Sequence, residues 1–291
     1  MGRVIVIGNA GLDLRLTVPR LPGPGETLIG QESARAPGGK GLNQAVMAAR
    51  CGAEVRFCAP LGNDEPQAHD VEAYLSREPI AERMLLRTDH PTDFSLVMVL
   101  PDGENSIVST SACSLAMKPE QMAPALRDVG EGDVVLLQGN LSIETTDFLL
   151  AAARERKART IFNPAPFWPG AEKLMGHCSV VVANKGEAAS LGEALAAAEQ
   201  AIVTLGREGC VLIEAGHCRS FAAQPVMAVD TTGCGDAFCG ALAAMLASGQ
   251  SIDQAINVAQ KAAALTATKP GAFDALPSSA ELTTISGPRA P

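Results

Sequence analysis

The chain has 291 residues, of which 47% are hydrophobic and 19% charged, and its formal net charge is −9 at pH 7. This length and apolar share are sufficient for one large α/β core. The acidic balance, with no Lys- or Arg-rich run in the sequence, argues against nucleic acid as a partner. A nucleotide must be held by local groups, because the global charge does not attract it.

Two features of the sequence bear on where the protein works. Eight cysteines occur without a Cys-x-x-Cys pair or metal-like spacing, and most lie in apolar runs, which predicts reduced thiols in the core. The chain begins with a strand-like run at residues 3–8 and not with a signal peptide, and no apolar run reaches the length of a membrane span. We therefore expect a cytoplasmic protein without membrane contact.

Short apolar runs alternate with helical stretches along much of the chain. The runs predict strands at residues 3–8, 54–61, 133–138, 159–162, 179–183, 201–205 and 210–214. The stretches predict helices at residues 41–52, 64–76, 144–157, 185–198, 236–248 and 251–268. This alternation is typical of an α/β fold in which helices cover both faces of a parallel sheet. Ligands of such sheets bind beyond the carboxyl ends of the strands, where most glycine- and Asn-rich motifs of this chain fall.

Two segments interrupt the alternation. Residues 12–35 carry Asp, Pro and Gly among extended residues, and residues 93–110 predict two strands around Asp102-Gly103, a strong hairpin signal. These strands form either a small separate β layer or an edge of the main sheet. Because the sequence shows no internal repeat and no long linker, we predict a single domain over residues 1–291. The Pro-, Ser- and Thr-rich tail from Ser278 favours fraying.

The stretch Asp230–Phe238 is the most informative motif of the chain. Gly233 and Gly235 permit a tight turn at the start of a helix, and their amides, with that of Cys234, form an anion site reinforced by the helix dipole. A carboxylate at the edge of such a site is unfavourable for binding alone. We therefore interpret Asp236 as a general base for a hydroxyl that attacks the bound anion. The alternative is an ordinary helix N-cap.

A second glycine cluster, Pro37–Ala45, precedes another Ala-rich helix. Its small residues let a ligand approach the backbone closely, and Asn43 offers donors and an acceptor to hydroxyl groups. Together, the two clusters suit a kinase that acts on a hydroxylated substrate.

Five segments, in this order along the chain, resemble the ribokinase (PfkB) family of sugar kinases. They are the two glycine clusters, Asn163-Pro164-Ala165-Pro166, Asn184-Lys185-Gly186-Glu187 and Thr204-Leu205-Gly206-Arg207-Glu208-Gly209. The resemblance covers nearly the whole chain. It implies a ribokinase-like three-layer α/β/α sandwich with a central, mostly parallel sheet and a small β lid over the sugar, formed by residues 12–36 and 92–112. Such lids often serve for dimerisation, so a homodimer through the lid is expected.

By this resemblance the protein transfers the γ-phosphoryl group of ATP to a primary hydroxyl of a sugar, with ribose or a related pentose or ketose favoured. Asp236 is then the base, and the amides of Gly233, Cys234 and Gly235 hold the developing charge. The alternatives are a nucleoside kinase of the same family and a catalytically silent sugar- or nucleotide-binding regulator. A dinucleotide-dependent dehydrogenase is disfavoured, because the segment Gly8–Leu12 lacks the required glycine pattern.

The resemblance also assigns sugar contacts. Asp13 is expected to hold two sugar hydroxyls, and the same pocket is expected to be lined by Gly38, Gly39, Lys40 and Asn43. The alternatives are a turn residue for Asp13 and a solvated charge for Lys40.

Two positions depart from the ribokinase pattern. Gly11 replaces an Asn, and Asn140 replaces a Glu after the strand at 133–138. Asn140 can still bond a substrate hydroxyl, but without a charge. We expect these changes to alter which hydroxyls the site accepts.

The phosphates need a cation, and the sequence contains no P-loop motif. In the family, the pair equivalent to Asn184 and Glu187 holds Mg²⁺ largely through water, although the same spacing also fits a capping box. The resemblance places the nucleotide near Asn184, Thr204, Gly206, Gly209 and Asn257. A hairpin explains the glycine turn equally well.

The resemblance further implies a monovalent cation, such as K⁺, beside the anion site. Its candidate ligands, mostly through backbone carbonyls, are Asp230, Thr232, Lys269, Gly271 and Ala275. Because Ala275 replaces a hydroxyl residue, one ligand is lacking.

Overall fold

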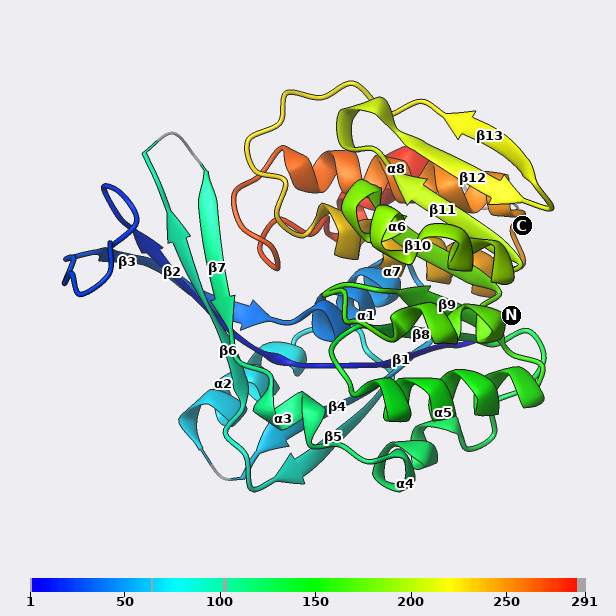
Figure 1. Ribbon diagram of the computed structural model, residues 1–291, viewed down its shortest axis with the longest axis horizontal. Helices are drawn as coiled ribbons and strands as arrows, with labels where there is room; N and C mark the ends of the chain where they lie inside the picture. The colour runs from blue at the N-terminus through cyan, green and yellow to red at the C-terminus, as the bar shows by residue number, and fades with distance from the viewer. Residues whose placement is uncertain (1, 64, 102–103, 287–291) are drawn as a thin grey trace.

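A nine-stranded sheet forms the centre of the protein, as the computed structural model shows for residues 2–63, 65–101 and 104–286 (Figure 1). Its strands are β1 (Val4–Ile7), β4 (Val55–Gly62), β5 (Glu82–Thr88), β8 (Val134–Gln138), β9 (Arg159–Asn163), β10 (Val180–Asn184), β11 (Gln200–Thr204), β12 (Cys210–Glu214) and β13 (His217–Phe221). The spatial order is β13-β12-β11-β10-β9-β8-β1-β4-β5. All neighbouring strands from β5 to β11 are parallel. Strand β12 pairs antiparallel with both β11 and β13.

Both faces of this sheet are buried, because alternate residues of each strand enter different cores. In β1, Val4 and Val6 belong to one apolar cluster, and Ile5 and Ile7 belong to the other. The first cluster is covered by α1 (Lys40–Arg50), α2 (Pro66–Leu75), α7 (Cys234–Ala247), α8 (Ile252–Ala267) and α9 (Ser279–Ser286). The second is covered by α4 (Pro119–Met122), η1 (Ala123–Leu126), α5 (Ile143–Glu155), η2 (Ala171–His177), α6 (Lys185–Leu191) and η3 (Gly192–Ala197). The predicted parallel sheet between two helical layers is confirmed.

A second sheet of four strands, hereafter the small sheet, projects from one side of this body (Figure 1). It consists of β2 (Gly11–Thr17), β3 (Gln31–Gly38), β6 (Asp93–Val99) and β7 (Asn105–Ser109), in the order β3-β2-β6-β7. The two segments that interrupt the predicted alternation therefore form a layer of their own. Because β2 begins shortly after β1 ends, the small sheet stands at the carboxyl ends of the parallel strands. The short α3 (Ala112–Leu115) connects β7 back to the main body.

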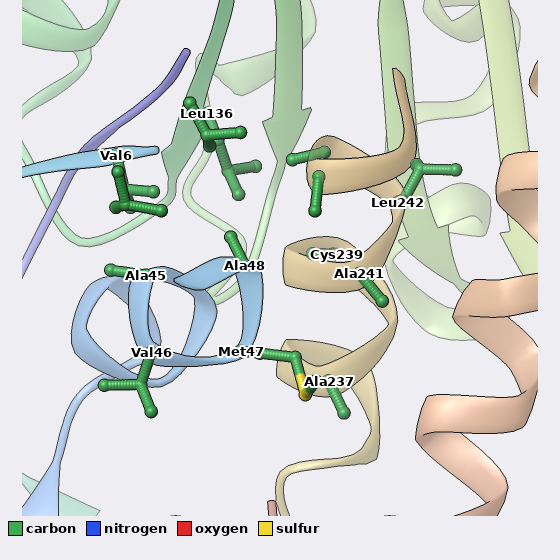
Figure 2. Close-up of a cluster of buried hydrophobic side chains, with 14 of the residues drawn as sticks. Val6, Ala45, Val46, Met47, Ala48, Leu136, Ala237, Cys239, Ala241 and Leu242 are labelled. Carbon is green, nitrogen blue, oxygen red and sulfur yellow. The ribbon is translucent and has the colours of Figure 1, made fainter. Parts of the chain in front are cut away.

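Helices α1 and α7 pack against each other without an intervening layer. Figure 2 shows Met47 of α1 directed toward Ala237 of α7 among small side chains of both helices. A Cβ atom on Gly240 would lie 2.5 Å from the carbonyl oxygen of Gln44 and 2.7 Å from the Cβ of Met47. Only glycine permits the two helices to lie this close at residue 240. The close packing brings the N-terminal ends of α1 and α7 together.

Several boundaries differ from the sequence-based expectation. Strands β5 and β13 were not expected, because both lie at sheet edges and carry charged or polar residues that hide the strand pattern. The helix predicted at 185–198 stops as an α-helix at Leu191 and continues as the 3₁₀ helix η3 after Gly192, whose φ is +54°. The tail predicted to fray contains α9, and the turn predicted at Asp102-Gly103 lies outside the described residues.

The cysteines agree with the expectation of reduced thiols. All eight cysteines are free thiols, and five of them are buried. Among the described residues, no helix combines the length and apolarity that crossing a bilayer requires.

Candidate active site

A pocket of about 470 Å³ opens at the carboxyl ends of the parallel strands, between the small sheet and the N-terminal ends of α1 and α7. Eight of the predicted site residues line it, namely Asp13, Gly39, Lys40, Asn43, Asn140, Thr232, Gly233 and Asp236. They come from distant parts of the sequence and meet because parallel strands direct their following loops to one edge of the sheet.

Asp236 lies in the first turn of α7 and is buried, with 6% of its surface exposed. Both of its carboxylate oxygens accept hydrogen bonds from α1. Oδ1 accepts from Nε2 of Gln44 at 2.9 Å, and Oδ2 accepts from Nδ2 of Asn43 at 3.2 Å. The carboxylate is therefore fixed in orientation at the wall of the pocket, next to the segment predicted to hold the sugar.

A chain of amide side chains lies behind Asp236. Nε2 of Gln138 donates to Oε1 of Gln44 at 2.9 Å, and Nε2 of Gln44 also donates to Oδ1 of Asn163 at 3.2 Å. Nδ2 of Asn163 in turn donates to the carbonyl oxygen of Val182 at 2.8 Å. Gln44 was not predicted as a site residue. Gln138 and Asn163 are the last residues of the neighbouring strands β8 and β9. Because ligands bind beyond the carboxyl ends of parallel strands, this position indicates that both residues lie near the site.

Asp13 lies on β2, and its carboxylate faces Gly38 of the paired strand β3. A Cβ atom on Gly38 would lie 2.2 Å from Oδ1 of Asp13, so the glycine makes room for this carboxylate. Burial raises the pKa of Asp13 to about 6; the negative charge of Asp236 also raises it, while Ser95 and the charge of Lys40 act in the opposite direction. The hydroxyl of Ser109 donates to that of Ser95 at 3.0 Å, which links β7 to β6 beneath Asp13.

Two buried acceptor atoms in the pocket wall have no hydrogen-bond partner among the described residues. They are Oδ1 of Asn43 and Oδ1 of Asn140. Because a buried acceptor without a partner is costly, each is suited to a donor from a ligand. The hydroxyl groups of a sugar are such donors.

Lys40 begins α1 directly after Gly39, whose φ is +101°. Lys40 lines the pocket, and its positive charge lowers the pKa of both Asp13 and Glu187. Its charge therefore acts on both carboxylates.

The predicted anion site lies at the start of α7. Gly233 is the N-cap residue and has a φ of +79°. The N–H of Cys234 donates to the carbonyl oxygen of Thr231 at 3.3 Å, so this amide is engaged within the loop. The amides of Gly233 and Gly235 remain the candidates for contact with a phosphate.

Asn184 and Glu187 form the capping box that the sequence offered as one interpretation. Oδ1 of Asn184 accepts from the N–H of Glu187 at 2.9 Å, and Oε2 of Glu187 accepts from the N–H of Asn184 at 2.9 Å. Burial raises the pKa of Glu187, and the charge of Asp236 adds to this effect. The described residues contain no cluster of three or more His, Cys, Asp or Glu side chains for a metal. A Mg²⁺ ion here would thus depend on water and phosphate oxygens, which suits its chemistry.

The other predicted nucleotide residues come from β11, the turn after it and α8. Thr204 pairs with Asn184 in the register of β11 and β10. Gly206 and Gly209 flank η4 (Gly206–Glu208) with φ values of +60° and +96°. Asn257 is exposed on α8. None of these four residues lines the pocket described above.

The residues predicted around a monovalent cation are partly brought together. Oδ1 of Asp230 accepts from Thr232, and Oδ2 accepts from the N–H of Gly271 at 2.9 Å. Nζ of Lys269 forms an ion pair with Glu281 at 2.6 Å, and Ala275 is fully buried without a side-chain oxygen. The guanidinium of Arg15 contacts Oδ2 of Asp230, so a cation that needs this carboxylate would have to displace Arg15.

Apolar side chains complete the pocket wall. Phe94 and Ile107 come from the small sheet, and Trp168 comes from the loop after β9. Nε1 of Trp168 donates to the carbonyl oxygen of Gly139 at 2.8 Å, which fixes the indole ring beside Asn140. Sequence reasoning gave these residues no role in the pocket.

The fold and this pocket define an α/β kinase of small hydroxylated molecules. The sequence model of the family described as pfkB family carbohydrate kinase matches residues 1–279. The chain is 32% identical to the ribokinase of Bacillus subtilis over 290 residues, which cover 97% of this chain and 98% of the relative. The chain therefore belongs to the pfkB family, and it is an ATP-dependent carbohydrate kinase.

Solved structures agree with this assignment. The ribokinase of Thermotoga maritima has a TM-score of 0.88 at 28% identity, with 98% of this chain and 99% of that chain covered. The Arabidopsis thaliana ribokinase, solved with ribose and ATP, shares the fold with a TM-score of 0.83 at 24% identity, and 98% of this chain and 99% of that chain are covered.

The pKa of about 6 for Asp13 predicts a pH dependence of sugar phosphorylation. The predicted sugar contact of Asp13 needs the ionised carboxylate as acceptor, so kcat/KM should fall about tenfold per pH unit below that value. In Asp13→Asn, kcat/KM should be lower than in the wild type above pH 6 and lack this inflection, so that the two profiles converge at low pH. The measurement is a pH profile of kcat/KM for the sugar; an inflection that persists in the variant assigns it to another group.

The same pKa fixes the sign of a stability effect. Because the folded-state pKa lies above the unfolded one, the contribution of Asp13 to stability is present below pH 4 and is lost as the pH rises through 6. Asp13→Asn should therefore raise the free energy of unfolding at pH 8, by at most about 3 kcal/mol, and leave it nearly unchanged at pH 4. Urea unfolding at both pH values tests this expectation.

Proposed function

We propose that this kinase phosphorylates a primary hydroxyl of a sugar, most suitably ribose or a related pentose or ketose, with Asp236 as general base. The proposal rests above all on the buried Asp236 carboxylate, which Asn43 and Gln44 hold at the pocket wall. Because its orientation is fixed in advance, it needs little reorganisation to take the hydroxyl proton. The alkoxide oxygen then attacks the γ-phosphorus, and the bond to ADP breaks.

The substrate would be oriented by three acceptors that converge on the pocket. Asp13 supplies an ionised carboxylate above its pKa of about 6, and Asn43 and Asn140 supply their unpartnered Oδ1 atoms. This set matches a ligand that presents several hydroxyl donors. Gly38 leaves the space for the Asp13 carboxylate, and Gly39 lines the pocket at the start of α1.

The phosphates would lie between the start of α7 and Lys40. The amides of Gly233 and Gly235 and the dipole of α7 favour negative charge there, and Lys40 adds a full positive charge. Mg²⁺, bound through water near Glu187, would neutralise charge on the transferred group. For the rest of the nucleotide we propose contacts with Asn184, Thr204, Gly206, Gly209 and Asn257.

A nucleoside is the second candidate substrate. Phe94, Ile107 and Trp168 give the pocket an apolar wall next to Asn140, and a planar base could pack on such side chains. A preference for nucleosides over free sugars in the assay below would select this alternative.

We also propose that the protein forms a homodimer through the small sheet. Val108, next to the pocket residue Ile107 on β7, points away from the pocket and is 61% exposed, and Ile29 is 85% exposed. Analytical ultracentrifugation should give a dimer for the wild type and a weaker dimer for Val108→Glu. A wild type that sediments as a monomer would refute this interface.

The role of Asp236 is tested by Asp236→Asn in an assay of ADP release over a panel of sugars and nucleosides. Loss of the base should lower kcat by roughly 10²- to 10⁴-fold with the fold intact. Asp253→Asn is the matched control, since Asp253 also lies in a first helical turn but is only partly buried and pairs with Arg219. Turnover that survives in Asp236→Asn refutes the base, and no ADP with any substrate favours a silent sugar-binding regulator.

The Mg²⁺ role is tested by Glu187→Gln. A Gln retains the capping box with Asn184, so the helix start should be preserved. We expect the Mg²⁺ concentration for half-maximal activity to rise about tenfold, as is typical when a group behind the metal is changed. Glu144→Gln, in the first turn of α5, serves as the control. An unchanged Mg²⁺ dependence would contradict the assignment.

A further inference from the structure

Arg15 connects the small sheet to the loop that precedes the anion site. It lies on β2, and its Nη1 and Nη2 atoms are both 3.4 Å from Oδ2 of Asp230. Both partners are largely withdrawn from solvent, with side-chain exposures of 23% and 11%. A pair of this kind differs from the exposed ion pairs elsewhere on the surface, because its charges are less screened by water.

A second contact joins the same two parts of the protein. Nδ2 of Asn105, at the start of β7, donates to Oγ1 of Thr232 at 3.2 Å. Oγ1 of Thr232 then donates to Oδ1 of Asp230 at 2.6 Å. Two strands of the small sheet thus contact the loop at residues 230–232, which leads directly into Gly233 and α7.

The acceptor positions of the Asp230 carboxylate are filled. Oδ1 accepts from the N–H and the hydroxyl of Thr232, and Oδ2 accepts from the N–H of Gly271 and from Arg15. An ionised carboxylate offers about four acceptor sites, so these donors use all of them. Burial raises the pKa of Asp230, but the hydrogen bonds from Thr232 and Gly271 and the charge of Arg15 outweigh burial and hold the pKa below its usual value.

The guanidinium lies where the sequence resemblance predicts a monovalent cation. It contacts Asp230, and its Nη1 atom lies 3.7 Å from the position that a Cβ on Gly271 would take. Asp230 and Gly271 belong to the predicted ligand set, in which Ala275 supplies no side-chain oxygen. The guanidinium of Arg15 therefore already supplies the positive charge that is favoured at this position.

We propose that Arg15 takes the place of the monovalent cation and acts as a positioning residue for the anion-site loop. It neutralises Asp230 from the small sheet, so the position of the loop depends in part on its contact with the small sheet. The inference rests on the proposed kinase function. It has the consequence that phosphorylation by this protein does not depend on K⁺.

The experiment compares the wild type, Arg15→Gln and the control Arg20→Gln. Arg20 is also next to β2, but it pairs with the nearby Glu26 and does not contact the loop. Initial rates of ADP formation are measured in KCl, NaCl and choline chloride at equal ionic strength. The wild type and Arg20→Gln should have equal rates in the three salts. Arg15→Gln should be at least about fivefold slower in choline chloride and recover in KCl, a ratio in the usual range for coupled sites.

A second measurement does not depend on catalysis. The melting temperature of the unliganded protein is determined in KCl and in choline chloride. Arg15→Gln should gain about 2 °C or more in KCl, because a bound ion stabilises the folded state, whereas the wild type should not change. If no substrate yields ADP, the proposed function fails while this melting experiment still decides the role of Arg15.

Three results would overturn the proposal. The first is activation of the wild type by KCl to the same extent as Arg15→Gln. The second is an Arg15→Gln variant as active as the wild type in choline chloride. The third is a slow Arg15→Gln variant that KCl neither activates nor stabilises, since Arg15 would then not occupy a cation site.

Discussion

The close packing of α1 and α7 is the constraint on which the active site depends. Gly240 lets α7 approach the backbone of Gln44, and one turn earlier Asp236 receives hydrogen bonds from Gln44 and Asn43. The same contact thus closes the apolar core and orients the proposed base. Because the two helices start at the same edge of the sheet, the glycine-rich segments before them also meet there. A larger side chain in this contact would separate the elements that the reaction needs together.

Local charges in the pocket offset the acidic character of the whole chain. The net charge is −9, yet the phosphate would face Lys40 and the N-terminal end of α7. Burial raises the pKa of Asp13 and of Glu187, and the charge of Asp236 contributes to both shifts. The negative charges of these carboxylates therefore repel one another in the free protein. A Mg²⁺ ion bound near Glu187 would supply positive charge beside that carboxylate and relieve part of this repulsion, although the nucleotide phosphates themselves are negative.

The sequence predicted the architecture and the central residues because both depend on local patterns. Apolar runs between helices indicated the parallel sheet, and the glycine clusters pointed to Asp236 and Asn43, which the structure brings within 3.2 Å. The contacts of Gln44 and Arg15 were not predicted, for a different reason. Each contacts a residue more than 190 positions away, at separations of 192 and 215. The spacing of residues along the sequence does not indicate a partner at such a distance. The polar edge strand β13 was not predicted, because its residues lack an apolar face.

The position of Trp168 has a practical consequence. The chain contains one tryptophan and one tyrosine, and the indole stands in the pocket wall with 40% of its surface exposed. Its intrinsic fluorescence therefore originates almost entirely from the place where substrates would bind. Emission from the unlabelled protein reports occupancy of that wall directly, without a coupled enzyme or an engineered probe.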